Sequence, residues 1–200
     1  MKFVVLAGGD IFEKLSAAHP QATWVQVNEA AAFLSHNDAD AFFDLQETAC
    51  TNEHPVVNKP LFVNSVIYPI APEKNAVRIN AWNGFLENDT WELHGVIGDS
   101  EKKVLEFLNK KYIECSDEPG FISPRIIAMI INEACFAEGE NVSTPAEIDT
   151  AMKLGTNYPY GPFEWAQKIG VKNIHALLKK LAMQDSRYTP APVLQKMIEN

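Results

Sequence analysis

The sequence has no surplus of positive charge. Its 200 residues include 17 lysines and arginines against 26 aspartates and glutamates, which gives a formal net charge of -9. Nucleic-acid-binding proteins usually present a basic patch to the phosphate backbone, so this balance argues against a nucleic-acid partner. It also slightly disfavours polyanionic ligands, although a local group of lysines can outweigh the net charge.

Cysteine is scarce as well. The three cysteines, Cys50, Cys115 and Cys135, are odd in number and show no CxxC spacing. This pattern indicates neither a disulfide framework nor a zinc site, and it is typical of reduced thiols in the cytoplasm. Because no cluster of His, Cys, Asp and Glu has metal-ligand spacing, we expect no metal and a cytoplasmic protein.

Long hydrophobic runs are also missing. The apolar run Phe3–Ala7 near the start is too short for a signal peptide or a membrane span, so we expect no membrane association. No internal repeat or low-complexity tract is present. What the chain does have is 46% hydrophobic and 22% charged residues, an ordinary composition for a globular protein with one large or two small domains.

The first part of the chain alternates short β-rich runs with turns and helical pieces. The expected strands are Lys2–Ala7, Thr23–Val27, Ala41–Leu45, Leu61–Ile67, Val77–Trp82, Thr90–Ile97 and Tyr112–Cys115. The expected helical pieces are Asp10–Ala18, Glu29–Leu34 and Ser100–Lys111. Continuous apolar strands separated by helices favour a mostly parallel sheet that is covered on both faces.

Beyond Pro119 the hydrophobic pattern changes to the period of a helix. The first helix is expected to begin with Ser123 as its N-cap and Pro124 in the first helical position. Its apolar stripe consists of Ile126, Ile127, Ile130, Ile131 and Ala134. This change of pattern sets the expected boundary between a first domain of residues 1–118 and a second of residues 119–200.

Later helices in the second domain are marked by their ends and faces. Thr144 and Glu147 have the spacing of a capping box, and Gly155 is expected to end the helix that they begin. Another amphipathic helix has an apolar stripe made of Ile174, Leu177, Leu178 and Leu181. Residues 188–192 are expected to be extended, because each proline there disfavours helix in the residue before it.

Residues 151–165 read AMKLGTNYPYGPFEW. This segment closely resembles the signature AMKLG-x-x-Y-P-x-GPFE of the C-terminal domain of 3-hydroxyacyl-CoA dehydrogenases. The resemblance extends from Asp117–Ile122, which is similar to the D-x-PGFI segment of the family, to Arg187–Met197, which is similar to its closing segment. It implies an α/β, shortened Rossmann-like domain followed by an all-α domain that forms a homodimer and covers one side of a site for an acyl-CoA-like molecule.

A dinucleotide site of the Rossmann type needs three glycines between the first strand and the first helix. Aligned with the family, these positions hold Ala7, Gly9 and Phe12, so only the second glycine is present. The resemblance implies an acidic residue after the second strand that would bind the adenosine ribose. Asn28 stands at this position instead. The helical excursion that contacts CoA in the family is also much shorter here. We therefore expect no bound NAD and no other cofactor.

The resemblance also locates the catalytic positions. In the family a histidine takes the proton of the substrate hydroxyl, and a glutamate twelve residues later orients that histidine. The segment Arg78–Gly84 fits the histidine motif but has Asn80 in place of the histidine, while Glu92 retains the glutamate position. An amide has no basic nitrogen near neutral pH, so Asn80 cannot take the proton.

The two substrate-holding positions of the family have changed too. The family's catalytic serine falls at Val66, or at Ser65 if the alignment is shifted by one residue. Its asparagine falls at Pro124, which has no side-chain donor, whereas the arginine that follows is retained as Arg125.

The histidines of the chain are candidates for a replacement base. They are His19, His36, His54, His94 and His175. His94 lies two residues from Glu92, so in a strand both side chains would face the same side, and a relocated Glu92–His94 pair is one alternative.

Taken together, these residues predict a degenerate family member without NAD-dependent dehydrogenase activity. It would act as a dimeric binding or scaffolding protein linked to fatty-acid and hydroxyacyl-CoA metabolism. The alternative is an active but divergent 3-hydroxyacyl-CoA dehydrogenase, an oxidoreductase that would need NAD.

Overall fold

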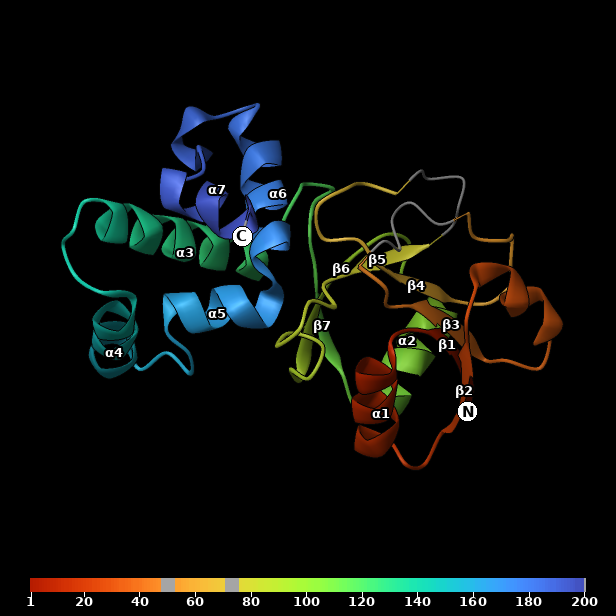
Figure 1. Ribbon diagram of the computed structural model, residues 1–200. Coiled ribbons are helices and arrows are strands. Elements are labelled where there is room, and N and C mark those ends of the chain that lie inside the picture. The colour runs from red at the N-terminus through yellow and green to blue at the C-terminus, as the bar shows by residue number, and fades with distance from the viewer. Residues whose placement is uncertain (48–52, 71–75, 200) are drawn as a thin grey trace. The chain divides into compact units, whose positions relative to one another are not determined.

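The computed structural model describes residues 1–47, 53–70 and 76–199. The chain divides into two compact units, Met1–Glu118 and Pro119–Asn200 (Figure 1). The first unit combines strands with helices, and the described part of the second contains helices joined by short connections. Across the described residues, no helix combines the length and the hydrophobicity needed to cross a bilayer.

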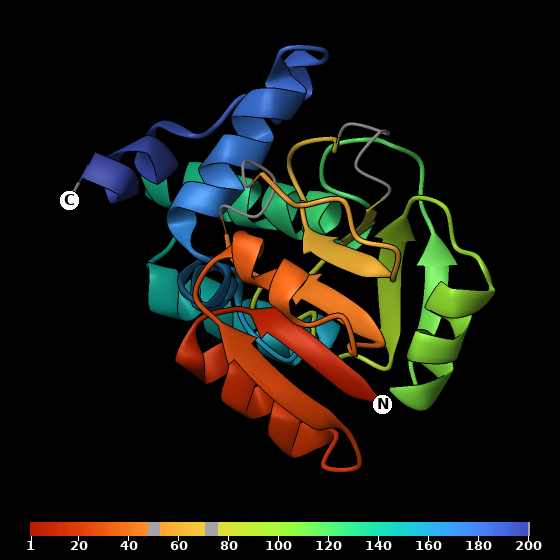
Figure 2. The same cartoon turned by 90° about the vertical axis from the view of Figure 1, so that its right-hand side faces the viewer.

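The first unit is built on one sheet, whose seven strands within the described residues are ordered β2-β1-β3-β4-β5-β6-β7. The strands are β1 Lys2–Leu6, β2 Thr23–Val27, β3 Ala41–Asp44, β4 Leu61–Asn64, β5 Val77–Ile79, β6 Thr90–His94 and β7 Lys111–Glu114. The first five run parallel, β6 runs antiparallel to β5, and β7 runs parallel to β6 (Figure 2). The predicted α/β fold with a mostly parallel sheet is confirmed.

Alternating side chains of β1 explain why both faces of the sheet are covered. Phe3 and Val5 join a core with residues of α1 (Gly9–Ala18) and α2 (Asp99–Phe107). Val4 and Leu6 join a second core with Phe33 of the 3-10 helix η1 (Ala30–Ser35). Burying one such side chain contributes roughly 1.5–3 kcal/mol, so a strand that is apolar on both sides is stable only between two layers.

The strands β4, β5 and β6 each end three residues earlier than predicted, whereas β1, β3 and β7 end one residue earlier. β4 ends at Asn64, because the next residue, Ser65, donates its hydroxyl to the Tyr68 carbonyl and turns the chain. β5 ends at Ile79, because the side-chain oxygen of Asn80 accepts the Trp82 amide and competes with the sheet ladder. β6 ends at His94 and is followed by Gly95, whose φ of 140° is rarely adopted by other residues.

Two helical predictions in the first unit also need correction. The predicted helix Ser100–Lys111 ends at Phe107, because Asn109 adopts a left-handed φ of 51° and Lys111 already pairs with Thr90 in the sheet. The segment predicted as helical over Glu29–Leu34 is the 3-10 helix η1 and is shifted by one residue.

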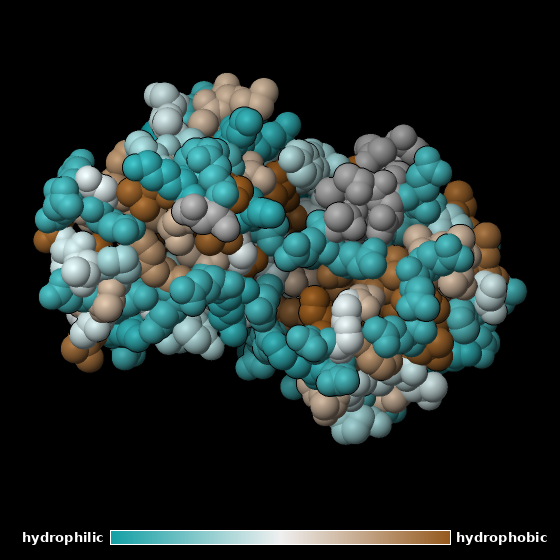
Figure 3. Space-filling view, viewed as in Figure 1, coloured by the Kyte–Doolittle hydropathy of each residue, from teal (hydrophilic) through white to brown (hydrophobic). Residues whose placement is uncertain are grey.

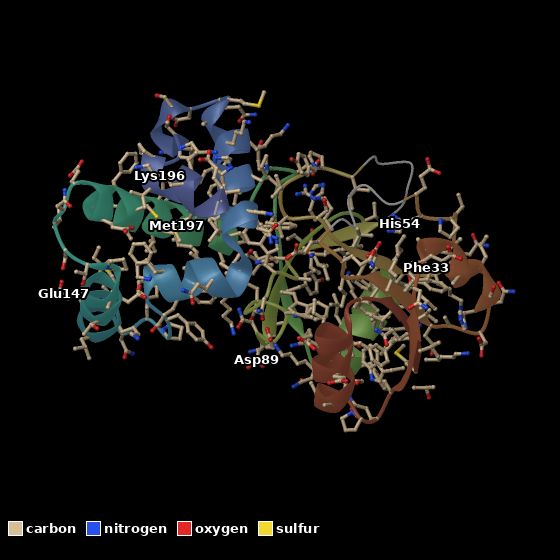
Figure 4. All side chains as sticks on the ribbon, viewed as in Figure 1. Phe33, His54, Asp89, Glu147, Lys196 and Met197 are labelled. Carbon is tan, nitrogen blue, oxygen red and sulfur yellow. The ribbon has the colours of Figure 1, made fainter. Side chains whose placement is uncertain are left out.

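The helices of the second unit are α3 Ser123–Gly139, α4 Pro145–Thr156, α5 Pro162–Ile169, α6 Val171–Ala182, the 3-10 helix η4 Ser186–Tyr188 and α7 Pro192–Glu199. The predicted capping box at the start of α4 is confirmed. The Glu147 amide donates to Thr144 Oγ1 at 3.4 Å, and the Thr144 amide donates to Glu147 Oε2 at 3.2 Å (Figure 4). The apolar stripe predicted for α6 is buried throughout.

Two helix ends in this unit were predicted wrongly. Ser123 is the first residue of α3 rather than its cap, because the left-handed Phe121, with a φ of 44°, turns the chain and leaves Ile122 at the cap position. Gly155 lies inside α4, which continues to Thr156. The left-handed residue that ends this helix is Asn157, with a φ of 56°, and asparagine tolerates that conformation better than most residues.

Within residues 151–165, Gly161 is required by close packing against α4. The Phe163 amide donates to Asp149 Oδ1 at 2.8 Å, which ties α5 to α4. A Cβ at Gly161 would lie 2.3 Å from that same oxygen, so no other residue fits. Phe163 and Trp165 are buried against the helices, and much of this segment therefore encodes packing.

Asn132 of α3 holds the extended segment that precedes α7. Its Nδ2 donates to the Thr189 carbonyl at 2.9 Å, and its Oδ1 accepts the Ala191 amide at 2.8 Å. Asn132 is 2% exposed and its bond to the Ala191 amide is buried, so losing that bond leaves a buried donor without a partner.

We predict that Asn132→Ala lowers the free energy of unfolding by about 2 kcal/mol, because the buried Ala191 amide and the partly buried Thr189 carbonyl lose their partner. Urea denaturation measures this change. The matched control is Glu133→Ala, at the exposed neighbouring position of the same helix, which should change stability by less than about 0.5 kcal/mol. Equal effects of the two substitutions would contradict the assignment.

Candidate functional site

Buried polar side chains collect at the carboxyl ends of the parallel strands. Asp44 ends β3, Asn64 ends β4, and Asn80 directly follows β5, and these residues are 0%, 4% and 3% exposed. Parallel strands place their carboxyl ends at one edge of a sheet, where α/β proteins bind their ligands. This edge is therefore the candidate site.

Asn80 and Glu92 are brought together by the pairing of β5 with β6. The Asn80 amide donates to the Glu92 carbonyl at 3.2 Å, and Asn80 Nδ2 donates to Glu92 Oε2, also at 3.2 Å. The remaining polar atom of the side chain, Oδ1, accepts the Trp82 amide at 3.4 Å. Glu92 is only 7% exposed, so the contact between its carboxylate and the side-chain amide of Asn80 is buried. No atom of the Asn80 side chain is basic enough to take a proton there.

Asn64 connects the ends of three strands. Its Nδ2 donates to the Gln46 carbonyl at 3.3 Å, just past β3, and its Oδ1 accepts the Ala81 amide at 3.2 Å, just past β5. Neither residue considered for the serine position offers a free hydroxyl. Val66 has none, and the hydroxyl of Ser65 donates to a backbone carbonyl. Both are buried at this edge.

His94 of β6 lies next to the ion pair between Arg78 of β5 and Asp117. The buried Arg78 pairs with Asp117 and donates from Nε to the Ser65 carbonyl at 3.0 Å. His94 Nε2 lies 3.7 Å from the carboxylate of Asp117, and its Nδ1 lies 2.8 Å from the Cys115 carbonyl. The structure thus gives His94 the carboxylate of Asp117 as a neighbour, while Glu92 bonds to Asn80.

His54 forms a pair that the sequence did not reveal. Its Nε2 lies 2.9 Å from Asp44 Oδ2, and the two side chains are 2% and 0% exposed (Figure 4). The other oxygen of Asp44 accepts the Gln46 amide at 3.1 Å. His54 Nδ1 is buried and has no hydrogen-bond partner among the residues that the structure describes. With Nε2 protonated, Asp44 orients the ring and Nδ1 is an acceptor.

The glycine turn lies at the same edge, after β1. Gly9 begins α1, and a Cβ built on Gly8 or Gly9 would meet no atom within 4 Å, so the backbone is open to approach. Phe12 is partly buried against the core that includes Phe3. Asn28 is exposed and directly follows β2. The structure therefore places Gly9 and Asn28 after neighbouring strands.

The remaining predicted positions are less informative. Pro124 is a buried residue in the first turn of α3, and Arg125 Nη2 donates to the Pro119 carbonyl at 2.8 Å. Cys115 and Cys135 are free thiols, and burial raises the pKa of Cys135 to about 12. Cys50 lies outside the described residues. In the described part of the chain, no three His, Cys, Asp or Glu residues are grouped as a metal site would require.

We predict that Asn80→Asp lowers the free energy of unfolding by about 3 kcal/mol at pH 7, because it places a second carboxylate beside the buried Glu92. Such a pair has one raised pKa. The penalty relative to wild type should therefore grow as pH rises above the carboxyl pKa of the unfolded chain and shrink on acidification towards pH 5. Denaturation at both pH values measures it.

The control for this substitution is Asn88→Asp in the exposed turn before β6, which should cost less than about 0.5 kcal/mol at either pH. A penalty for Asn80→Asp that does not depend on pH would contradict the buried carboxylate contact.

The comparison with known proteins concerns mainly the second unit. Residues 120–200 match the family model of the 3-hydroxyacyl-CoA dehydrogenase C-terminal domain. A probable 3-hydroxybutyryl-CoA dehydrogenase of Deinococcus radiodurans is 41% identical over 99 residues, which are 48% of this chain and 36% of that protein. One of Bacillus subtilis is 38% identical over 98 residues, 48% of this chain and 34% of that protein. The match thus spans about a third of these relatives' length.

A solved structure extends the likeness to the whole fold. The crystal structure of (S)-3-hydroxybutyryl-CoA dehydrogenase from Ralstonia eutropha has a TM-score of 0.72 and covers 99% of this chain and 93% of that one. Its sequence identity of 19% means that this likeness shows the fold alone. The resemblance read from the sequence is confirmed for the second unit: residues 120–200 form a 3-hydroxyacyl-CoA dehydrogenase C-terminal domain.

Proposed function

We propose that this protein lacks NAD-dependent dehydrogenase activity and acts in the cytoplasm as a dimeric protein that binds an acyl-CoA-like molecule or serves as a scaffold in hydroxyacyl-CoA metabolism. The observation that carries this proposal is the buried hydrogen bond from Asn80 Nδ2 to Glu92 Oε2. It joins the two positions where the resemblance implies a catalytic histidine and its glutamate.

The chemistry explains why this substitution matters. Oxidation of a hydroxyl group needs an acceptor for the hydroxyl proton while the hydride leaves the carbon. The amide of Asn80 is a donor to Glu92 and an acceptor for the Trp82 amide, and neither of these atoms is basic near neutral pH. Glu92 is left without an imidazole to orient.

The first strand and helix support the same proposal. Ala7 and Phe12 stand where a Rossmann turn needs glycine, and Asn28 stands where it needs a carboxylate. An amide can bond to a ribose hydroxyl, but without the charge that makes such a bond strong. A cofactor is therefore not part of the proposed function.

We predict that NADH and NADPH do not raise the thermal unfolding midpoint, whereas CoA or acetoacetyl-CoA does, since any molecule that binds the folded state raises it. A calorimetric titration of NADH checks the first half independently. A dissociation constant in the micromolar range for NADH would overturn the proposed loss of the cofactor.

We predict that wild type and Asn80→His are equally inactive when acetoacetyl-CoA reduction is followed by NADH consumption. A positioned general base contributes roughly 10²–10⁴-fold, but only when the other reacting groups are already held in place. Without bound nicotinamide there is no hydride for that factor to act on. Recovery of turnover by Asn80→His alone would show that the cofactor site is intact.

A second candidate function is that of an active but divergent 3-hydroxyacyl-CoA dehydrogenase that uses NAD. The observation in its favour is His94, which is partly exposed and lies 3.7 Å from the carboxylate of Asp117. The same assay separates the candidates. Wild-type turnover clearly above a reaction without protein, abolished by Glu92→Gln or His94→Ala but not by His36→Ala, would establish the divergent enzyme and end the first proposal.

The proposed dimer rests on apolar side chains that the second unit exposes. Ile122 and Ile126, one turn apart at the start of α3, are 47% and 53% exposed, and other hydrophobic residues of this unit appear as separate patches in Figure 3. A second copy of the chain would cover them, as the family resemblance implies.

We expect light scattering to give a dimer at tens of micromolar, because the exposed isoleucines are buried only when two copies associate. Ile126→Glu should shift the protein to monomer, since it would bury an unpaired charge in the contact. Val56→Glu, at an 87% exposed apolar position of the first unit, is the control and should leave the dimer intact. A wild-type monomer would contradict the proposed assembly.

A further inference from the structure

The segment that joins β5 to β6 contains an asparagine that is followed by a glycine. Asn83 and Gly84 form the only such pair in the sequence. The Phe85 amide donates to the Trp82 carbonyl at 2.9 Å, so a closed turn contains the pair. This turn connects the two strands whose pairing brings the candidate catalytic positions together.

The turn requires glycine at position 84. Gly84 has a φ of 99°, a conformation that residues with a Cβ rarely adopt. The same missing Cβ leaves the backbone nitrogen of Gly84 open to the side chain of the residue before it. The glycine that closes the turn therefore also removes the main steric obstacle to a reaction between Asn83 and this nitrogen.

No hydrogen bond within the described part of the chain holds either reacting group of this pair. Asn83 is exposed, and its side-chain amide has no partner among the described residues. The N–H of Gly84 likewise donates to none of the described carbonyls. Asn64 and Asn80 differ, because both are buried and their side-chain amides are hydrogen-bonded. The side chain of Asn83 is therefore free to turn its carbonyl carbon towards the nitrogen of Gly84.

We propose that Asn83 is a modification site at which the chain deamidates itself through a cyclic imide. The backbone nitrogen of Gly84 loses its proton and bonds to Cγ of Asn83, and the bond between Cγ and the side-chain nitrogen breaks. That nitrogen leaves as ammonia and takes a proton with it. Water then adds to one of the two ring carbonyls and opens the ring. The net change is hydrolysis of an amide, so no oxidant or reductant is consumed.

The ring can open in two ways. When the bond from the ring nitrogen to Cγ breaks, the product is aspartate and the backbone is unchanged. When the bond from the ring nitrogen to the backbone carbonyl carbon breaks, the product is isoaspartate, whose main chain runs through the side chain and is one methylene longer. Both products have a carboxylate in place of the amide. The site lies in the first unit and does not depend on the proposed function.

Formation of isoaspartate changes the turn and the residues next to it. The extra methylene lies between Trp82 and Phe85, so the hydrogen bond that closes the turn is lost. The Trp82 amide also donates to Asn80 Oδ1 at 3.4 Å, so a displacement of Trp82 removes a partner of Asn80 at the candidate site. The fraction of altered molecules grows with time after synthesis.

The first test follows the reaction in the folded full chain, stored at pH 8 in water enriched in heavy oxygen. Newly formed carboxylates take up the label, and mass spectrometry of peptides locates it. Asn83 should become labelled at least about tenfold faster than Asn88, which is exposed in the same segment but is followed by Asp89, a residue with a Cβ. An unlabelled Asn83, or equal labelling of the two asparagines, would overturn the site.

The second test asks whether the ring forms. Isoaspartate arises through the ring, and an isoaspartyl methyltransferase adds a methyl group to isoaspartate but not to aspartate. Stored wild type should accept methyl groups, more so after storage at higher pH, because the Gly84 nitrogen must lose its proton. Asn83→Gln should accept none, since its longer side chain would have to close a larger ring. Equal acceptance by the two proteins, or labelled Asn83 without isoaspartate, would overturn the cyclic route.

The third test measures the effect on the turn. Anion exchange separates the modified molecules, and Asn83→Asp is the matched control because it has the new charge without the extra methylene. The isoaspartate form should have a lower thermal unfolding midpoint than Asn83→Asp, which should unfold as wild type does. Equal midpoints of the isoaspartate form and Asn83→Asp would overturn the predicted loss of the turn.

Discussion

The parallel pairing of β1, β3, β4 and β5 is the constraint on which the rest of the first unit depends. Because these strands run in one direction, the residues that end them meet at a single edge. Asp44, Asn64 and Asn80 are buried at that edge, and buried polar atoms are stable only with partners. Two of these polar side chains therefore form hydrogen bonds within the protein. Asn64 bonds to the segments after β3 and β5, and Asn80 bonds to Glu92.

These hydrogen bonds within the protein have a direct chemical consequence. A histidine opposite Glu92 would be oriented by the carboxylate and would still have a second nitrogen for substrate. Asparagine in the same place bonds to the carboxylate and to the Trp82 amide, so its polar atoms are used within the protein. The sheet brings Asn80 and Glu92 together, and the side chain of Asn80 has no basic atom that could accept a proton. Under the proposed function, the fold is present without the dehydrogenase chemistry, and this one side chain accounts for the difference.

The sequence predicted the sheet and most helices because their signals are local. The apolar strand Lys2–Leu6, the capping box of Thr144 and Glu147, and the stripe of α6 each follow from a few neighbouring residues. Element ends were harder, since the ends of β4 and β5 depend on side-chain bonds and the end of α4 depends on the conformation of Asn157. The resemblance assigned Asn80 and Glu92 to two catalytic positions, and the structure shows that their side chains are hydrogen-bonded. The Asp44–His54 pair was not predicted, because it joins a strand end to a loop without a periodic pattern.

The most direct test of the account is whether hydride ever reaches the substrate. The protein would be incubated for many hours with acetoacetyl-CoA and NADH that has deuterium at both C4 positions, and the product would be analysed by mass spectrometry. Because slow chemistry accumulates, even a very weak enzyme becomes visible. The account predicts no deuterium at C3 of 3-hydroxybutyryl-CoA above a reaction without protein. Deuterium at that carbon in amounts exceeding the protein itself would contradict it.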